Sequence, residues 1–386
     1  MVWLETVEAY ARARTRLWGA AGLWGGLLLI GFDIYAAVVT YIPQYRFRND
    51  FRLLYGAALI GPRQGFDHLY DLAAQKAAVE GLGQGFYWSP FLNPPPLVWL
   101  ATPLTILPFG LALLVWSFLL FGALLLTWYL VAPGEGLTKA AYLAMWLGVF
   151  PVAFGLMVGQ PVALVAAAVA ACWWLSQRNR MLLAGLALSL IALKPQVAIL
   201  VPLCLLVSGH ARIFGAWFAA TALMALVALA MLGPDGLARY RDALSLASQW
   251  EPTRRYAVAG LVGLGPQLYV AQAIVAAAAL LAAWRHRHDG PALPIAAGIT
   301  ASLLFTPYVG FQDCAMLFVA AWLVIRAQAT DWQLGMLLTG FALLELALVV
   351  NPAFILAAET SLLASIVWPA NVTGKEAGAV AEARPG

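Results

Sequence analysis

The chain has 386 residues, of which 63% are hydrophobic and only 10% are charged, against about 25% charged residues in a typical soluble domain. This composition excludes an ordinary soluble protein and predicts an integral membrane protein. The formal net charge is +4, and the basic residues lie mostly beside apolar runs, as expected near an anionic leaflet, so nothing indicates nucleic-acid binding. The three cysteines lie inside apolar runs, which excludes a disulfide framework.

Apolar runs recur from residue 17 to residue 369 and predict an all-α, polytopic helical bundle forming one membrane domain over residues 1–369. No signal peptide with a cleavage site precedes the first run, which is therefore expected to be an uncleaved helix. At about 20 apolar residues per span, or fewer where a helix is interrupted, about twelve spans are expected. The candidates are 17–40, 111–132, 138–156, 161–175, 181–193, 196–208, 213–232, 267–284, 291–306, 314–326, 334–350 and 354–369.

The apolar piece 97–107 is too short to cross, because as a helix it would be about 16 Å long at about 1.5 Å per residue. We therefore expect it to dip into the membrane and return. Short basic loops set the orientation, since such loops stay in the cytoplasm. They contain Arg12, Arg14, Arg16, Arg178, Arg180, His210, Arg212, Arg285, Arg287 and Arg326.

This orientation places two long segments, 41–96 and 233–266, on the outer side, and long loops in compact folds are commonly functional. The small polar segment 370–386 is expected to be a disordered cytoplasmic tail. The sequence thus predicts a multi-pass protein of the bacterial inner membrane with its functional side in the periplasm.

The first outer segment begins with an unusual concentration of charge, Arg46, Arg48, Asp50 and Arg52, directly after an apolar run. Aromatic residues are interleaved with charges farther along, a mixture that suits helices lying in the headgroup layer. "LLYGAALIG" and "HLYDLAAQKAAVEGL" both have apolar residues at helical spacing and predict two short juxtamembrane helices. The second outer segment has the same amphipathic character.

Lys194 is the clearest charge at membrane depth, where an ionisable group costs at least a few kcal/mol. The helices expected on either side of it, 181–193 and 196–208, would each be about 20 Å long, against about 30 Å of hydrocarbon. They predict a hairpin whose Lys-Pro-Gln tip stops inside the membrane and faces a cavity. The alternative is a lysine that extends to the headgroups.

Gly159, Gln160 and Pro161 interrupt another apolar run and place an amide near the same outer side. Broken helices at membrane depth are tolerated where they line protein or a water-filled cavity, although an ordinary turn has the same sequence. "LLFTPYVGFQDCAML" adds Tyr308, Gln312 and Asp313 on that side. The carboxylates of Asp33, Glu345 and Glu359 are expected to be structural.

The four histidines do not pair with cysteines or carboxylates at metal-ligand spacings, so no metal site and no cofactor is predicted. The phosphate-binding, dinucleotide-binding and serine-hydrolase motifs are absent from the sequence. What remains is a carboxylate in a basic, aromatic segment facing a membrane-depth lysine. A carboxylate suits a general base for a hydroxyl, and cations suit a phosphate. This combination favours sugar transfer from a lipid phosphate, since departing phosphate needs cationic stabilisation.

Five segments follow one another along the chain: "NDFRLLYGAALIGPRQGFDHLYD", "FYWSPFLNPPPLVWLATPLTILPFGLALLVW", "GQPVALV", "AGLALSLIALKPQVAIL" and "LLFTPYVGFQDCAML". In this order they resemble the opening segment, the proline-rich segment, the Gly-Gln turn, the Lys-Pro-Gln hairpin and the later Tyr-Asp segment of glycosyltransferase family 87. This family comprises polyprenol-phosphate-mannose-dependent mannosyltransferases and their relatives with the GT-C fold. The similarity covers residues 20–326 in order.

The resemblance implies that Asp50 is the catalytic base, and that Lys194 and Gln196 bind near the donor phosphate. It also implies a decaprenyl- or undecaprenyl-phosphate sugar as donor, inversion at the anomeric carbon, and no nucleotide sugar or obligate metal. Two departures stand out. Leu54 precedes Tyr55 where the family usually has two tyrosines, and Gln312 separates Phe311 from Asp313 where Tyr-Asp is usual.

The sequence therefore predicts an inverting glycosyltransferase that moves a hexose, with mannose as the family precedent, from a polyprenyl-phosphate sugar to a lipid or glycan acceptor. No obligate protein partner is predicted. A transporter or flippase of lipid-linked intermediates is the alternative, since it too requires broken helices and membrane-depth charge; an assembly subunit without chemistry is a third possibility. The residues expected around the donor and substrate are Arg46, Arg48, Arg52, Tyr55, Gln160, Lys194, Gln196, Arg254, Arg255 and Asp313.

Overall fold

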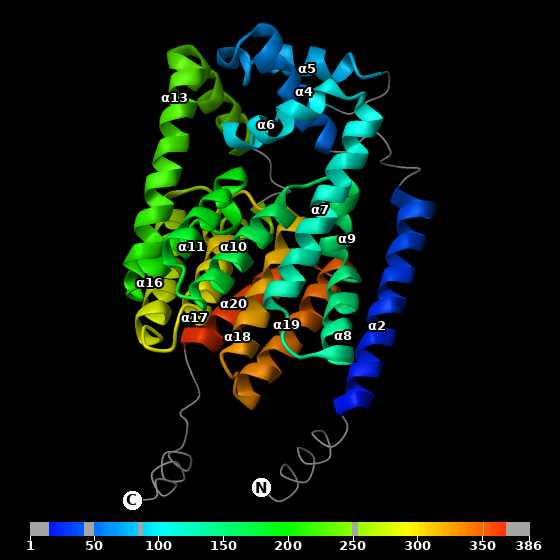
Figure 1. The fold of residues 1–386 in the computed structure, drawn as a ribbon, viewed down its shortest axis with the longest axis vertical. Helices are drawn as coiled ribbons and strands as arrows, with labels where there is room; N and C mark the ends of the chain where they lie inside the picture. The colour runs from blue at the N-terminus through cyan, green and yellow to red at the C-terminus, as the bar shows by residue number, and fades with distance from the viewer. Residues whose placement is uncertain (1–14, 42–49, 84–87, 249–253, 350, 368–386) are drawn as a thin grey trace, which may run out of the picture.

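The computed structural model describes residues 15–41, 50–83, 88–248, 254–349 and 351–367, and within these ranges every regular element is a helix. The prediction of an all-α protein is confirmed for this part of the chain. Most helices form a long bundle, and a smaller group, which we call the outer cap, lies at one end of it (Figure 1). The outer cap consists of α4 (Asp50–Gln64), η2 (Phe66–His68), α5 (Leu72–Glu80), α6 (Pro95–Ala101) and η3 (Thr102–Ile106).

The bundle is built from apolar helices of very different lengths. Its elements are α2 (Thr15–Ala36), η1 (Ala37–Tyr41), α7 (Phe109–Val131), α8 (Gly136–Leu147), α9 (Phe150–Val158), α10 (Val162–Ser176), α11 (Met181–Leu188), η4 (Ser189–Leu193), η5 (Pro195–Val197), α12 (Val201–Val207), α13 (Ala211–Ser248), α15 (Ala259–Val262), α16 (Pro266–Arg285), α17 (Ala292–Phe305), η6 (Phe311–Ala315), α18 (Met316–Arg326), α19 (Asp331–Val349) and α20 (Ala353–Val367). Helix α2 lies at the side of the bundle and packs along α8 (Figure 1).

Each of the twelve predicted spans contains a helix, but the count of about twelve crossings is not confirmed. Four helices of the described residues are long and apolar enough to cross a membrane alone: Arg16–Val39, Phe109–Val131, Ala211–Leu246 and Pro266–Arg285. The pair α8 and α9, bent by 60°, would add a fifth. The other apolar helices are shorter, among them Val162–Ser176, Met181–Leu193 and Ala292–Phe305.

The short apolar piece 97–107 stays at the outer end of the molecule. Both α6 and η3 pack on α4, and α7 begins directly afterwards at Phe109, whose ring stacks on Phe51 of α4 at a centroid distance of 6.0 Å. The chain therefore enters and leaves this piece at the same end of the bundle (Figure 1). A piece that crossed the bundle would instead reverse the direction of every later helix. The two short helices predicted in segment 41–96 are present as α4 and α5.

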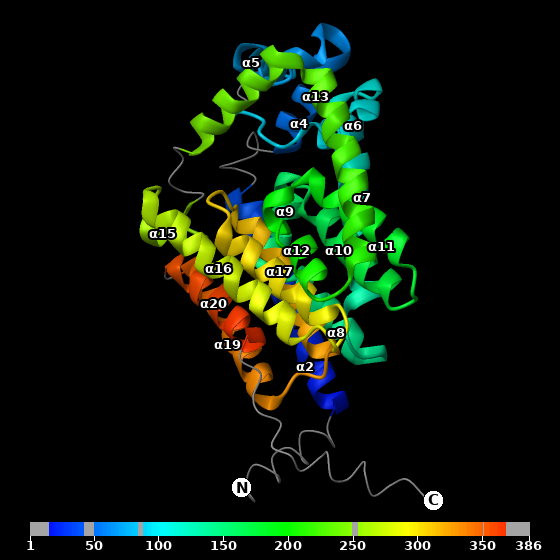
Figure 2. The ribbon, with the colours of Figure 1, turned by 90° about the vertical axis from the view of Figure 1, so that its left-hand side faces the viewer.

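The second outer segment differs from the connecting loop expected over 233–266, because α13 continues through it to Ser248 (Figures 1 and 2). The helix bends at Gly233, whose φ of 59° is accessible to glycine, and Pro234 then fits the first turn of the outer half. The outer half packs on the outer cap, where Tyr240 stacks on Tyr70 at 4.1 Å. The two long segments thus form one structure.

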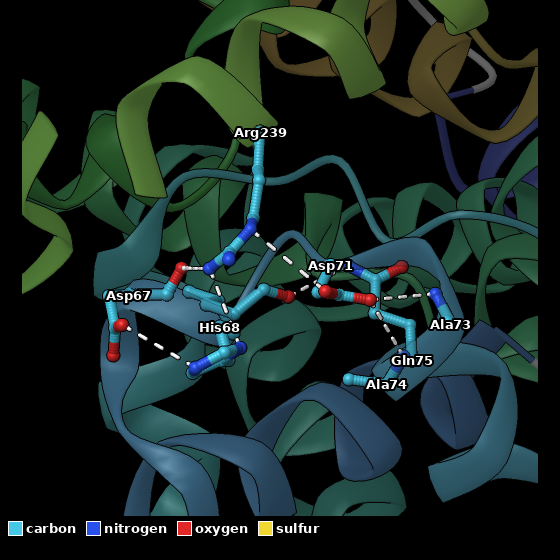
Figure 3. Close-up of polar contacts among 8 residues, drawn as sticks. Asp67, His68, Asp71, Ala73, Ala74, Gln75 and Arg239 are labelled. Carbon is cyan, nitrogen blue, oxygen red and sulfur yellow. Dashed lines mark hydrogen bonds and ion pairs between the residues drawn. The ribbon is translucent and has the colours of Figure 1, made fainter. Parts of the chain in front are cut away.

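Arg239 of α13 adds polar contacts to this packing (Figure 3). Its Nη1 donates to the backbone carbonyl of Asp67 at 2.8 Å, and its Nε lies 3.9 Å from the carboxylate of Asp71. His68 lies against the same guanidinium, with Nδ1 at 3.4 Å from Nη1. We call Asp67, His68, Asp71 and Arg239 the outer network. Its side chains are about a third to a half exposed, so it is a surface contact between α13 and the outer cap.

Candidate active site

Asp50 opens α4 at the edge of the outer cap that meets the bundle. The next residue, Phe51, is fully buried and stacks on Trp116 of α7 at 5.4 Å. An acidic residue in the first turn is favoured by the helix dipole, which is positive at this end. The Asp50 carboxylate is half-buried, and its Oδ2 accepts a hydrogen bond from Nε2 of Gln160. The cap and the bundle therefore meet at this carboxylate.

Gln160 is held at the end of α9 by a glycine-terminated helix cap. Gly159 has a φ of 75°, its N–H donates to Leu156 at 3.2 Å, and the N–H of Gln160 donates to the carbonyl of Gly155 at 2.9 Å. This pair of bonds is the Schellman arrangement, which favours glycine at the left-handed position. Pro161 then leads into α10. The Gly-Gln-Pro sequence is thus a rigid helix end that presents an amide to Asp50.

Lys194 lies between η4 and η5, where its φ of −153° and ψ of 75° interrupt the helical hairpin. Its side chain is buried, so the alternative of a lysine extending to the headgroups does not apply. The ammonium donates to Oε1 of Gln160 at 2.7 Å and to Oδ1 of Asp313 at 2.5 Å. A buried charge is costly unless it is paired and hydrogen-bonded, and this ion pair meets that requirement.

Asp313 completes the arrangement from η6. The residue is fully buried, and its second oxygen, Oδ2, accepts from the backbone N–H of Gly310 at 2.9 Å. Asp50, Gln160, Lys194 and Asp313 therefore form one continuous chain of hydrogen bonds contributed by four separate segments. We call these four side chains the inner network. It brings together four of the residues that the sequence indicated.

The electrostatics of the inner network favour a proton acceptor at Asp50. Burial raises the pKa of the Asp50 carboxyl above its ordinary value, while the Gln160 hydrogen bond and the Lys194 charge lower it and Asp313 raises it. Arg52, two residues along the same helix, also lowers it. A carboxylate whose pKa is moved toward neutral pH is a better general base. Asp50 is partly exposed, whereas Lys194 and Asp313 are buried, so Asp50 is the carboxylate of the network that a substrate hydroxyl can reach.

Two residues of α4 that were predicted to lie around the substrate, Tyr55 and Arg52, make contacts outside the inner network. The Tyr55 hydroxyl donates to the backbone carbonyl of Leu107 at 2.8 Å, so it anchors η3 to the cap rather than joining the inner network. The Arg52 guanidinium is buried and lies 6.0 Å from the centre of the Phe109 ring. Burial lowers the pKa of Arg52 to about 10, which leaves it a cation at neutral pH, close enough to Asp50 to act on its charge.

Gln196 contributes its backbone rather than its side chain, since its carbonyl accepts a hydrogen bond from Oγ1 of Thr306 at 3.0 Å. This bond ties the Lys-Pro-Gln tip to the end of α17. Arg46 and Arg48, predicted as phosphate or acceptor contacts, lie outside the described residues.

Arg254 and Arg255 of the second outer segment are followed directly by Tyr256, which contacts η6. Tyr256 packs on Phe311 at a ring distance of 5.8 Å, and Phe311 lies two residues before Asp313. Arg254 is half-buried and Arg255 is exposed. The segment that carries both arginines therefore packs on η6, the element that contains Asp313.

Tyr308, which the sequence placed on the same outer side as Asp313, is a further residue of the site. Its phenol is largely enclosed by protein, and burial raises its pKa further in the presence of the nearby Asp50 and Asp313 carboxylates. It therefore stays a neutral hydroxyl beside two acidic side chains. The sequence did not single it out as a substrate contact, although its place five residues before Asp313 was a signal for that role. Within the described ranges, no group of three or more His, Cys, Asp or Glu side chains could hold a metal ion.

The sequence profile of glycosyltransferase family 87 matches residues 91–307, which is more than half of the chain. Gln160 and Lys194 fall inside the matched region, whereas Asp50 lies well before its start and Asp313 shortly after its end. No curated protein and no solved structure matches the chain. The extent of the profile match, together with the apolar helices and the order of the site residues, shows that the chain belongs to glycosyltransferase family 87 and is a membrane glycosyltransferase.

Proposed function

We propose that the protein transfers a hexose, with mannose as the first candidate, from a polyprenyl-phosphate sugar to a hydroxyl of a lipid or glycan acceptor, with inversion at the anomeric carbon. The observation that carries the proposal is the inner network, in which a partly exposed carboxylate of the outer cap is joined to a buried Lys194–Asp313 pair. Membership in a glycosyltransferase family favours this enzyme over a transporter of lipid-linked sugars.

In the proposed reaction Asp50 takes the proton of the acceptor hydroxyl. The hydroxyl oxygen forms a bond to the anomeric carbon as the bond from that carbon to the phosphate oxygen breaks. The electron pair leaves with the polyprenyl phosphate, which needs a cation rather than a proton donor because phosphate is a good leaving group. This single displacement inverts the anomeric centre.

The phosphate requires more positive charge than Lys194 supplies, because Asp313 already balances that ammonium at 2.5 Å. Arg52 and the pair Arg254 and Arg255 are therefore the proposed partners of the phosphate, with Lys194 contributing from behind Gln160. Guanidinium groups suit this role because they bind phosphate oxygens with two parallel hydrogen bonds.

The proposed outer location of the site follows from α7, which connects the two ends of the bundle. Phe109 at its start stacks on Phe51, beside Asp50. At its other end, Arg326 donates to the carbonyls of Val131 and Ala132 at 2.7 and 2.8 Å. Arg326 belongs to the basic loops expected in the cytoplasm. Asp50 and these loops thus lie at opposite ends, which supports a periplasmic site in a bacterial inner membrane.

The donor class is tested with the purified full-length protein in detergent, supplied in parallel with decaprenyl-phosphate mannose and GDP-mannose and with a membrane extract as acceptor. We expect labelled mannose to be transferred from the lipid phosphate alone, and decaprenyl-phosphate glucose gives the comparison for the sugar. Transfer from GDP-mannose, without any from the lipid donors, would refute the proposed donor.

A further inference from the structure

The side-chain amide of Gln160 can take only one of its two flip orientations in the inner network. An ammonium can only donate hydrogen bonds and an ionised carboxylate can only accept them. The carbonyl oxygen must therefore face Lys194, at 2.7 Å, and the NH₂ group must face Asp50. The chemistry of the two neighbours fixes the orientation, so the side chain is restrained at its tip by both.

The backbone of Gln160 is restrained as well. In addition to the helix cap that holds it, the carbonyl of the preceding Gly159 accepts a hydrogen bond from Nε1 of Trp116 at 2.8 Å. Trp116 is fully buried and stacks on Phe51, the residue next to Asp50. The same aromatic contact thus locates both ends of the bond between Gln160 and Asp50.

Gln160 also separates two charged groups that would otherwise attract each other. Lys194 makes its direct ion pair with Asp313, and it reaches Asp50 through the amide. A direct ion pair with Lys194 would strongly favour the ionised form of Asp50 and weaken it as a base. The intervening amide passes on part of this stabilisation and occupies one carboxylate oxygen.

We propose that Gln160 is a positioning residue for the glycosyl transfer: its NH₂ group holds Oδ2 of Asp50 so that Oδ1 faces the acceptor hydroxyl, while its carbonyl keeps Lys194 on Asp313. This role rests on the proposed function, in which Asp50 is the base. Within the described residues, Gln160 is the side chain whose hydrogen bond to Asp50 the structure shows. Gln160 then acts through Asp50 and does not bind the donor.

Two substitutions separate the two ends of the amide. Gln160→Met removes both hydrogen bonds with little change in volume, and Gln160→Glu keeps an acceptor for Lys194 but places a second carboxylate beside Asp50. Within the described residues, the other charged or titratable groups that act on Asp50 are Arg52, Lys194, Asp313 and Tyr308, and both substitutions leave these residues in place.

The readout is transfer from decaprenyl-phosphate mannose by the full-length protein, measured from about pH 4 to about pH 9, which spans the range in which a shifted carboxylate would titrate. For Gln160→Met we expect kcat to fall by about 10²-fold, the cost of a small displacement of a reacting group, with the KM for the donor unchanged. The acid side of the kcat/KM profile should move up by about one pH unit or more, because the lost hydrogen bond favoured the charged carboxylate. Gln160→Glu should move it further, since like charges raise the pKa of one partner.

Gln267→Met is the matched control, because Gln267 is exposed at the start of α16 and bonds only to the nearby carbonyl of Val262 among the described residues. A raised donor KM with kcat and the pH profile unchanged would make Gln160 a donor contact and overturn the proposal. Profiles equal to wild type for both variants would overturn it too. If Gln160→Met does not fold, the proposal is tested by Gln160→Glu alone, whose kcat/KM profile should shift upward in pH on its acid side. Equal transfer by wild type and Asp50→Asn would instead refute the proposed function.

Discussion

The protein has two polar networks between its outer cap and its bundle, and they differ in burial. The inner network links Asp50, Gln160, Lys194 and Asp313, and its ion pair is nearly inaccessible, with side-chain exposures of 4% and 1%. The outer network of Asp67, His68, Asp71 and Arg239 is exposed to solvent by about a third or more. Both join segments that are far apart in the sequence.

The difference indicates which network is structural and which is chemical. Exposed ion pairs are worth about 0–1 kcal/mol, because water and salt screen them. Beside this network the rings of Tyr70 and Tyr240 stack at a centroid distance of 4.1 Å and bury apolar surface between α13 and the outer cap. A buried pair costs several kcal/mol in desolvation and contributes little net stability. The inner network is therefore placed where charge is expensive, which is typical of a functional site.

The largest difference between the two networks is expected when Lys194 is substituted. Lys194→Met should lower the free energy of unfolding by about 3–5 kcal/mol, because it leaves the Asp313 carboxylate buried without its cation. Adding Asp313→Leu should recover much of this loss, since the uncompensated charge is then gone. Thermal unfolding of the purified variants in detergent measures both. A double variant as unstable as Lys194→Met alone would show that the pair is not the source of the loss.

A smaller effect is expected at the helix end that carries Gln160. Gly159→Ala should cost about 1–2 kcal/mol, because the left-handed conformation at φ 75° crowds a Cβ atom. It should also reduce the transfer rate by displacing Gln160. The matched control is Gly122→Ala in the interior of α7, where an added Cβ meets nothing within 4 Å and the change should be neutral or stabilising. Equal stability of the two variants would contradict the strained position.

The smallest effect is expected in the outer network. Arg239→Ala should change the free energy of unfolding by less than about 1 kcal/mol, because the guanidinium is partly exposed. The transfer rate should remain close to that of wild type. The same unfolding and transfer assays measure it. A loss as large as that of Lys194→Met would mean that the exposed contact, and not the aromatic stacking, fastens the cap.

Much of this arrangement could be predicted from local sequence patterns. Apolar runs located the helices, and breaks at Gly159 and Lys194 located the helix ends that carry the site. The extent of α13 was not predicted, because Gly233 and Pro234 read as a loop although here they only bend a helix. The outer half stays helical because it packs on the cap, a tertiary contact that no local pattern contains.

The residues of the inner network were indicated by the sequence, but their pairing was not. Lys194 was expected to meet phosphate, yet its direct partner is Asp313, 119 positions away. Gln160 was expected near the substrate, yet it bonds to Asp50, 110 positions away. Charge and helix breaks show where a site lies along the chain. They carry no information about which of several short segments meet inside a bundle.

Single-turnover transfer by Asp50→Asn, measured together with donor binding, tests the central claim most directly, and Asp242→Asn on the exposed face of α13 is the control. The substitution keeps the shape of the side chain and removes its capacity to accept a proton. We expect the chemical step to slow by about 10²–10⁴-fold, the usual contribution of a general base, while affinity for decaprenyl-phosphate mannose stays the same. Transfer at the wild-type rate would contradict the assignment of Asp50 as the base.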